Sequence, residues 1–124
     1  MANPFVHVEL NTQELAKSKD FYGKLFDWKL EDIPMGSVSD EPYTMIGVGS
    51  GTGGGIMKHP MAGAPTFWLS YVLVDDIQDS TAKAKSLGAA IIRDVTEIPG
   101  MGWLSIIQDP QGAVLGLWKA AERQ

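Results

Sequence analysis

The sequence predicts an α+β fold of two tandem βαβββ modules, and two observations carry this prediction. First, the chain repeats itself, because three anchor pairs lie 62 residues apart: His7 and Leu69, Leu15 and Ile77, and Leu25 and Leu87. Second, each repeat opens with a strand pattern and a helical pattern and continues into three short strand patterns. A duplicated unit of this kind buries its hydrophobic face against its copy. We therefore expect function where the two modules face each other.

Length and composition favour one domain over residues 1–124. A chain of 124 residues with 44% hydrophobic content suits a single globular domain, and either half alone is too small to bury a core. We expect module one at 1–58, a linker at 59–65 and module two at 66–124. The chain has no cysteine, which excludes disulfides, thiolate nucleophiles and zinc–thiolate sites.

Module one is predicted to begin with a strand and a helix. Leu15, Phe21, Tyr22, Leu25 and Phe26 form one apolar stripe at helical spacing, and Asn11 or Thr12 is the expected N-cap. The elements expected in this module are a strand at 4–10, a helix at 12–25, and strands at 27–33, 42–48 and 54–58.

Module two repeats this order, and its helix ends and turns carry clearer sequence signals. Asp75 and Asp76 stand where carboxylates cap a helix, and Gly88 stops the same helix. The turn sequence Asp109-Pro110-Gln111-Gly112 joins the last two strands as a hairpin. The expected elements are a strand at 66–74, a helix at 77–88, and strands at 89–94, 102–108 and 113–119.

The charge pattern narrows the class of partner. The net charge is −5 and the ten Lys and Arg residues are dispersed, so nucleic acid is not an expected partner. No apolar run approaches the ~18 residues that span a bilayer, and the N-terminus shows no signal-peptide pattern. We expect a cytoplasmic protein with no membrane partner. The glycine-rich stretch 49–55 lacks the Lys-Ser/Thr ending of a phosphate loop and is interpreted as a turn.

The first strand separates polar from apolar side chains. Val6, Val8 and Leu10 alternate along the strand with Phe5, His7, Glu9 and Asn11. The apolar set Val6, Val8 and Leu10 must meet the helix, so His7 and Glu9 face the opposite side. A buried, unpaired carboxylate costs several kcal/mol, so Glu9 needs a donor, water or a raised pKa. Two interpretations stay open for His7: a contact to ligand, or a histidine that is merely hydrogen-bonded.

Five segments, VHVEL, FYGKLFDW, VLVDDI, SLGA and QDPQGAVLGLW, together resemble the vicinal oxygen chelate superfamily. That superfamily includes glyoxalase I, bleomycin resistance proteins and extradiol dioxygenases, and the resemblance is strongest to small bacterial proteins related to lactoylglutathione lyase. It implies that the eight strands form a cup-shaped, half-open sheet. It also implies a divalent metal held in the cup by up to four ligands from the first and last strand of each module.

The metal ligands that the resemblance implies are mostly missing. His7 occupies the first ligand position, but the other three fall on Leu69, on Gly54 or Gly55, and on Gly116. One imidazole does not hold a transition metal, since known sites use three or four protein ligands. We therefore expect no metal cofactor.

Aromatic residues gather at related positions and suggest a hydrophobic pocket. By the repeat offset Tyr71 is the counterpart of Glu9, and Trp118 follows Gly116 by two residues on the same strand face. Tyr43 and Trp103 add ring surface, and the glycines leave room in the cup. Trp68 is expected to pack toward the second helix.

Two functions follow as hypotheses. The first is a protein that binds a small planar or aromatic molecule in the cup between the modules, using His7, Glu9, Tyr43, Tyr71, Trp103 and Trp118, without a metal. The alternative is a divalent-metal-dependent lyase or dioxygenase that uses His7 and Glu9. Whether the protein is an enzyme stays open between them. A homodimer is expected, because small members of the resembled superfamily pair and open sheet edges favour it.

Overall fold

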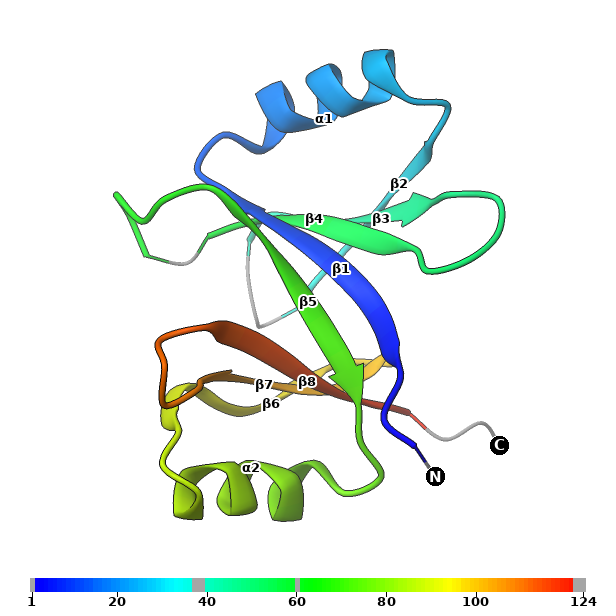
Figure 1. Ribbon diagram of the computed structural model, residues 1–124. Coiled ribbons are helices and arrows are strands. Elements are labelled where there is room, and N and C mark those ends of the chain that lie inside the picture. The colour runs from blue at the N-terminus through cyan, green and yellow to red at the C-terminus, as the bar shows by residue number, and fades with distance from the viewer. Residues whose placement is uncertain (1, 37–39, 60, 122–124) are drawn as a thin grey trace. The chain divides into compact units, whose positions relative to one another are not determined.

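The structure is a computed structural model that describes residues 2–36, 40–59 and 61–121 (Figure 1). Along the chain its elements follow the order βαβββ–βαβββ, which confirms the predicted α+β class and the two repeats. The chain divides into two compact units. Residues 7–69 form one, and the described parts of 1–6 and 70–124 form the other. No helix among the described residues is long and apolar enough to cross a membrane.

The unit of residues 7–69 holds one helix and four strands, with strand order β2-β3-β4-β1. Strand β1 pairs with β4 in parallel, and the other neighbours are antiparallel. Helix α1 lies along one face of these strands (Figure 1), where Leu15 and Tyr22 pack on the buried side chains of Leu10, Ile46 and Ile56. The elements are β1 (Phe5–Thr12, within this unit from His7), α1 (Leu15–Leu25), β2 (Lys29–Ile33), β3 (Tyr43–Gly47) and β4 (Gly54–Lys58).

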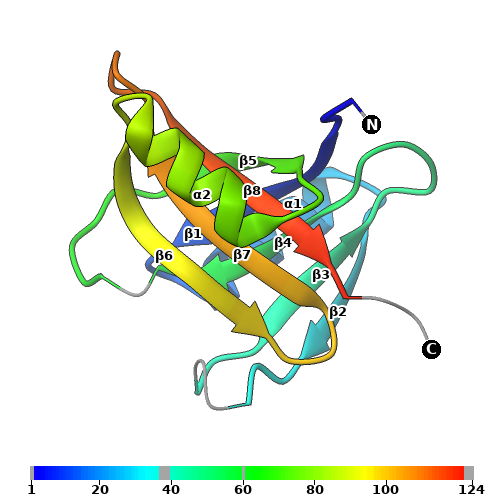
Figure 2. The same ribbon diagram turned by 90° about the horizontal axis from the view of Figure 1, so that it is seen from below.

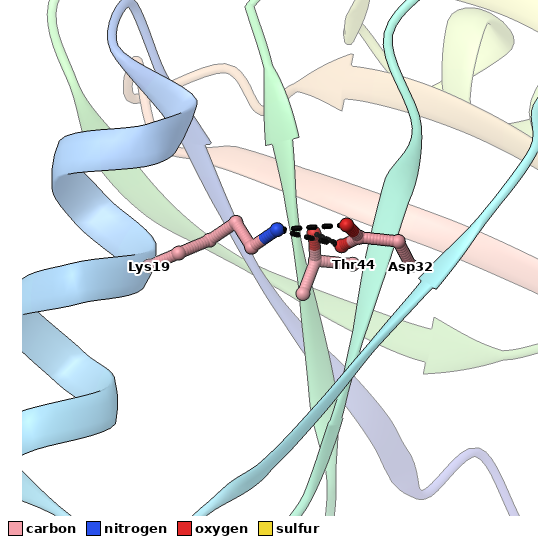
Figure 3. Close-up of polar contacts among 3 residues, drawn as sticks. All are labelled: Lys19, Asp32 and Thr44. Carbon is pink, nitrogen blue, oxygen red and sulfur yellow. Dashed lines mark hydrogen bonds and ion pairs between the residues drawn. The ribbon is translucent and has the colours of Figure 1, made fainter.

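The strand-facing side of α1 is partly polar, which corrects the predicted apolar stripe. Ser18 Oγ donates to Thr12 Oγ1 at 2.8 Å, and Lys19 Nζ contacts both carboxylate oxygens of Asp32 at 2.8 and 2.9 Å (Figure 3). Phe21 instead stands 58% exposed. Thr44 Oγ1, which is fully buried, also donates to Asp32, and these hydrogen bonds from Lys19 and Thr44 lower the pKa of the Asp32 carboxyl. Hydrogen bonds therefore hold part of α1 against the strands, where apolar packing alone was predicted.

The predicted helix cap is also corrected. The N-cap residue of α1 is Glu14, with no side-chain cap, because β1 continues to Thr12 and the helix begins at Leu15. Thr12 Oγ1 accepts a hydrogen bond from the Glu14 amide at 3.1 Å, so it shapes the turn before the helix. Asn11 lies inside β1, where its side chain bonds Glu9 and not the helix.

The second unit repeats the plan, with strand order β5-β8-β7-β6 and β5 parallel to β8. Helix α2 lies across β8 and β7 (Figure 2), over a core of Val74, Ile77, Ile107 and Leu117. The buried Thr81 and Ser105 hydroxyls, 2.8 Å apart, tie α2 to β7. The elements are β5 (Phe67–Leu73, within this unit from Ser70), α2 (Ile77–Ser86), β6 (Ala90–Ile98), β7 (Gly102–Gln108) and β8 (Val114–Ala120).

The helix cap, the helix end and the turn predicted for this unit are confirmed. Asp76 accepts from the Asp79 amide at 2.9 Å and caps α2, and Gly88 has φ +104°, a left-handed conformation that ends the helix region. Asp109 Oδ1 accepts from the amides of Gln111 and Ala113, so the predicted turn joins β7 and β8. Only β6 departs clearly from its predicted bounds, ending at residue 98 instead of 94.

Candidate functional site

Strand β1 carries a row of polar side chains on one face. Glu9 is 2% exposed and Asn11 is 4% exposed, while Leu10 between them packs under α1. This alternation is the one predicted, with the apolar residues toward the helix and the polar residues on the other side. These two buried polar residues on one face of the strand must find hydrogen-bond partners.

Tyr43, the first residue of β3, supplies the central partner. Its Oη donates to Glu9 Oε2 at 2.8 Å and lies 2.5 Å from His7 Nε2. Asn11 Nδ2 donates to the other carboxylate oxygen, Glu9 Oε1, at 3.1 Å. The rings of His7 and Tyr43 are stacked with their planes at 27° and their centroids 6.0 Å apart. The four side chains, which we call the Glu9 cluster, form one hydrogen-bonded group within residues 7–69.

Burial sets the charge of His7. It lowers the pKa of His7 to about 4, so the imidazole is neutral near pH 7. Tyr43 Oη donates to Glu9 Oε2, and the direction of its hydrogen bond with His7 Nε2 follows the tautomer of the imidazole. The cluster is therefore a chain of hydrogen bonds that links His7 through Tyr43 to Glu9.

A glycine makes room for the Tyr43 ring. Gly55 is the register partner of Glu9 on one side and of Met45 on the other, so it faces the Glu9 cluster. A Cβ atom at Gly55 would overlap the ring of Tyr43. The sequence left the fourth-strand ligand position open between Gly54 and Gly55, and the register assigns Gly55 to this face. The room expected above that glycine is filled by Tyr43.

The Glu9 cluster does not fit the divalent metal that the resemblance implies. Tyr43 Oη engages His7 Nε2, and the two carboxylate oxygens of Glu9 accept hydrogen bonds from Tyr43 and Asn11. No group of three or more His, Cys, Asp or Glu side chains that could hold a metal ion lies within 2–36, 40–59 and 61–121. Stable sites need three or four protein ligands.

The second unit shows the same relation between a tyrosine and a glycine. Tyr71 is 2% exposed and pairs in register with Gly116, and a Cβ atom at Gly116 would overlap the Tyr71 ring. By strand alternation Trp118 shares the face of Gly116. Trp103 lies on the opposite face, where it packs on the core under α2 and has Lys119 Nζ 5.8 Å from its ring centroid. Tyr71 and Trp118 therefore share one face, which Trp103 does not.

The prediction that Trp68 packs toward the second helix is wrong. Its Nε1–H donates to Tyr22 Oη on α1 at 3.3 Å, and its ring meets Tyr22 and Trp28 edge-on. The physical reason is that the first three residues of β5 belong to the unit of residues 7–69. Its partners are therefore the aromatic residues of the first helix and of the turn after it.

Sequence reasoning gave no site role to two members of these groups. Asn11 was placed on the strand face of Glu9, but the only role predicted for it was that of a helix cap. Trp28 was not singled out, and its signal is the aromatic-rich segment from Phe21 to Trp28 at the end of the helix. Both signals become visible once the strand and helix ends are known.

With this fold and these residues in place, comparison with known proteins defines the class. The profile of the Glyoxalase/Bleomycin resistance protein/Dioxygenase superfamily matches residues 5–117, and the chain belongs to this superfamily. The "Putative glyoxylase CFP32" of Mycobacterium tuberculosis is 37% identical over 82 residues, which cover 66% of this chain and 31% of that protein. The anthracycline biosynthesis protein DnrV of Streptomyces peucetius is 23% identical over 129 residues, covering 90% and 45%. The chain thus spans less than half the length of these relatives.

Solved structures share the fold at low sequence identity. The hypothetical protein BH1468 from Bacillus halodurans aligns with a TM-score of 0.73 at 12% identity, covering 100% of this chain and 99% of that one. Methylmalonyl-CoA epimerase from Mycobacterium tuberculosis aligns with a TM-score of 0.71 at 14% identity, covering 95% and 88%. At these identities the likeness concerns the fold alone.

Proposed function

We propose that this protein binds a small, planar, hydroxylated aromatic molecule without a metal ion, and that the Glu9 cluster orients it. The observation that carries the proposal is the buried Glu9 carboxylate, 2% exposed, held by Tyr43 and Asn11 and linked through Tyr43 to a neutral His7. A ligand hydroxyl is a hydrogen-bond donor, which suits a site built around a carboxylate.

Aromatic rings favour the planar class of ligand. Tyr71 and Trp118 of the second unit share one strand face, and such rings bind a planar ligand by stacking. Trp103 packs under α2 on the opposite face. A relative of this chain is named for anthracycline biosynthesis, and anthracyclines are planar hydroxylated aromatic compounds. That name supports the chosen ligand class.

The alternative, a metal-dependent lyase or dioxygenase that uses His7 and Glu9, is less well supported. It would require Tyr43 Oη to leave both candidate ligand atoms and a further ligand to arrive. The hydrogen-bonded chain from His7 to Glu9 could instead serve proton transfer without a metal, which is a role for the same residues in acid–base chemistry.

The test is a titration with 1,4-dihydroxyanthraquinone, followed by its absorbance. We expect saturable binding to the wild type and binding weakened about tenfold by Tyr43→Phe, which removes the hydrogen bond from Tyr43 to Glu9. Tyr22→Phe is the matched control, because Tyr22 lies on α1 and its hydroxyl accepts a hydrogen bond from Trp68, away from the Glu9 cluster. Equal affinity in all three proteins, or no saturable binding to the wild type, would contradict the proposal.

A further inference from the structure

We infer a second binding site, for a small uncharged aromatic molecule, in a pocket on the helix side of residues 7–69. The pocket has a volume of about 290 Å³, and its walls include Trp28, Trp68, Val8 and Ile46. It lies on the opposite face of β1 from the Glu9 cluster, because Val8 alternates with His7 and Glu9. The two sites are therefore separated by the strand itself, and this inference does not depend on the proposed function.

The two tryptophan walls are held in place from behind. Their ring centroids lie 6.3 Å apart and the rings stand at 79° to each other. Tyr22 contacts both: its ring stacks on Trp28 at 5.9 Å, and its hydroxyl accepts the Trp68 Nε1–H at 3.3 Å. Phe26 also packs on Trp28, with the two ring centroids 4.6 Å apart. Walls fixed in advance lose little conformational entropy when a ligand binds.

Glycines keep the floor of the pocket free of side chains. Gly53 and Gly54 line it where β4 approaches β1, and the Val8 amide donates to the Gly53 carbonyl at 3.1 Å. A Cβ atom at Gly54 would overlap the Val8 carbonyl, and one at Gly53 would lie 2.9 Å from the Ile46 carbonyl oxygen. Close backbone approach therefore requires glycine at both positions, and the same lack of side chains leaves the volume open.

The lining defines the chemical class of the ligand. Among the described residues, the remaining members of the lining are Val48 and Thr52, and none of the lining side chains is charged. An ionised ligand would therefore lose its hydration without compensation from these residues. Two rings at a right angle offer one face and one edge, the two arrangements that aromatic partners prefer. A cavity of roughly 150 Å³ accommodates benzene, so about 290 Å³ suits one ring or two fused rings.

The test uses 5-fluoroindole and the indole N–H signals of the four tryptophans in a ¹H–¹⁵N correlation spectrum of the full chain. We expect the Trp28 and Trp68 signals to shift in a saturable manner and those of Trp103 and Trp118 to stay in place. Trp68→Ala should weaken binding about tenfold, because it removes one aromatic wall. Trp103→Ala, the same truncation in the other unit, should not change the affinity.

The outcomes separate this site from the proposed one. Shifts at Trp118 without shifts at Trp28 and Trp68 would overturn the second site and would place indole at the ring surface of the proposed function. No saturable shift in the wild type would also overturn it. Because the wild-type spectrum alone decides between these results, the test stands even if Trp68→Ala does not fold. Tyr43→Phe should leave the affinity for 5-fluoroindole unchanged while it weakens the binding of 1,4-dihydroxyanthraquinone.

Discussion

The ring of Tyr43 occupies the space that a side chain at Gly55 would need. Tyr43 reaches this position diagonally, because Met45 is the direct partner of Gly55 and Tyr43 lies two residues along the same strand face. From there its hydroxyl meets both His7 and Glu9. The glycine thus sets the geometry of the whole cluster.

Gly55→Ala should destabilise the protein by about 1–3 kcal/mol, because the added methyl group overpacks against the Tyr43 ring. Urea denaturation measures the change. Gly47→Ala is the control: a Cβ there meets Lys29 Cβ at an ordinary 3.6 Å and should cost little. Equal effects of the two substitutions would mean that the Tyr43 ring does not lie over Gly55.

Tyr43→Phe should cost about 1.5–3 kcal/mol of stability near pH 7, because it deprives the buried Glu9 carboxylate of a hydrogen-bond donor. Combining Tyr43→Phe with Glu9→Gln should recover part of this loss, since a neutral amide is less costly to bury than a carboxylate short of donors. Chemical denaturation of the single and double variants gives the coupling. Strictly additive effects would argue against the contact.

Low pH should destabilise the protein through His7. Above pH 6.5, the ordinary value, the imidazole is neutral in both the folded and the unfolded chain. Below pH 6.5 the imidazole of the unfolded chain takes up a proton, while that of the folded chain does not until about pH 4. The free energy of unfolding therefore falls steadily across this window and then levels off. The loss is of the order of 3 kcal/mol. His7→Gln should lack this component, which the difference between the two stability–pH curves isolates; identical curves would refute the buried neutral imidazole.

Elemental analysis of protein purified without chelators should find no stoichiometric Zn, Ni, Fe or Mn. The reason is that Tyr43 Oη engages His7 Nε2 and Glu9 Oε2, which would have to be released to bind a metal. Turnover of the lactoylglutathione lyase substrate is expected to be absent, with and without added metal. One equivalent of bound metal that is lost on His7→Ala would overturn this prediction and revive the metal-dependent alternative.

The sequence predicted the elements well where local chemistry decides them. Strand alternation placed Glu9 and His7 on one face. Asp76 correctly predicted the cap of α2, and Gly88 correctly predicted where the helix region ends. The prediction failed where contacts with residues elsewhere in the sequence decide which side chains face the strands. Ser18 and Lys19 face the strands because Thr12 and Asp32 lie there as partners, which helical periodicity cannot show.

The site was predicted in its residues but not in its contacts. His7, Glu9 and Tyr43 were all singled out, yet their joining depends on the register between β3 and β4, which brings Tyr43 over Gly55. Trp68 was assigned to the wrong helix because no local pattern indicates which helix a strand residue meets. Its partner Tyr22 lies 46 residues away in the sequence.

Assembly gives the last prediction: we expect a homodimer that uses α1. Phe21 and Leu25 on this helix are 58% and 55% exposed, an apolar surface that a second chain could cover. Light scattering should give about 27 kDa, twice 13.4 kDa. Phe21→Asp should shift the mass to about 13 kDa, whereas Leu87→Asp, at a residue 70% exposed in the other unit, should not. A wild-type monomer across a wide concentration range would exclude the dimer, and a dimeric Phe21→Asp variant would exclude α1 as its interface.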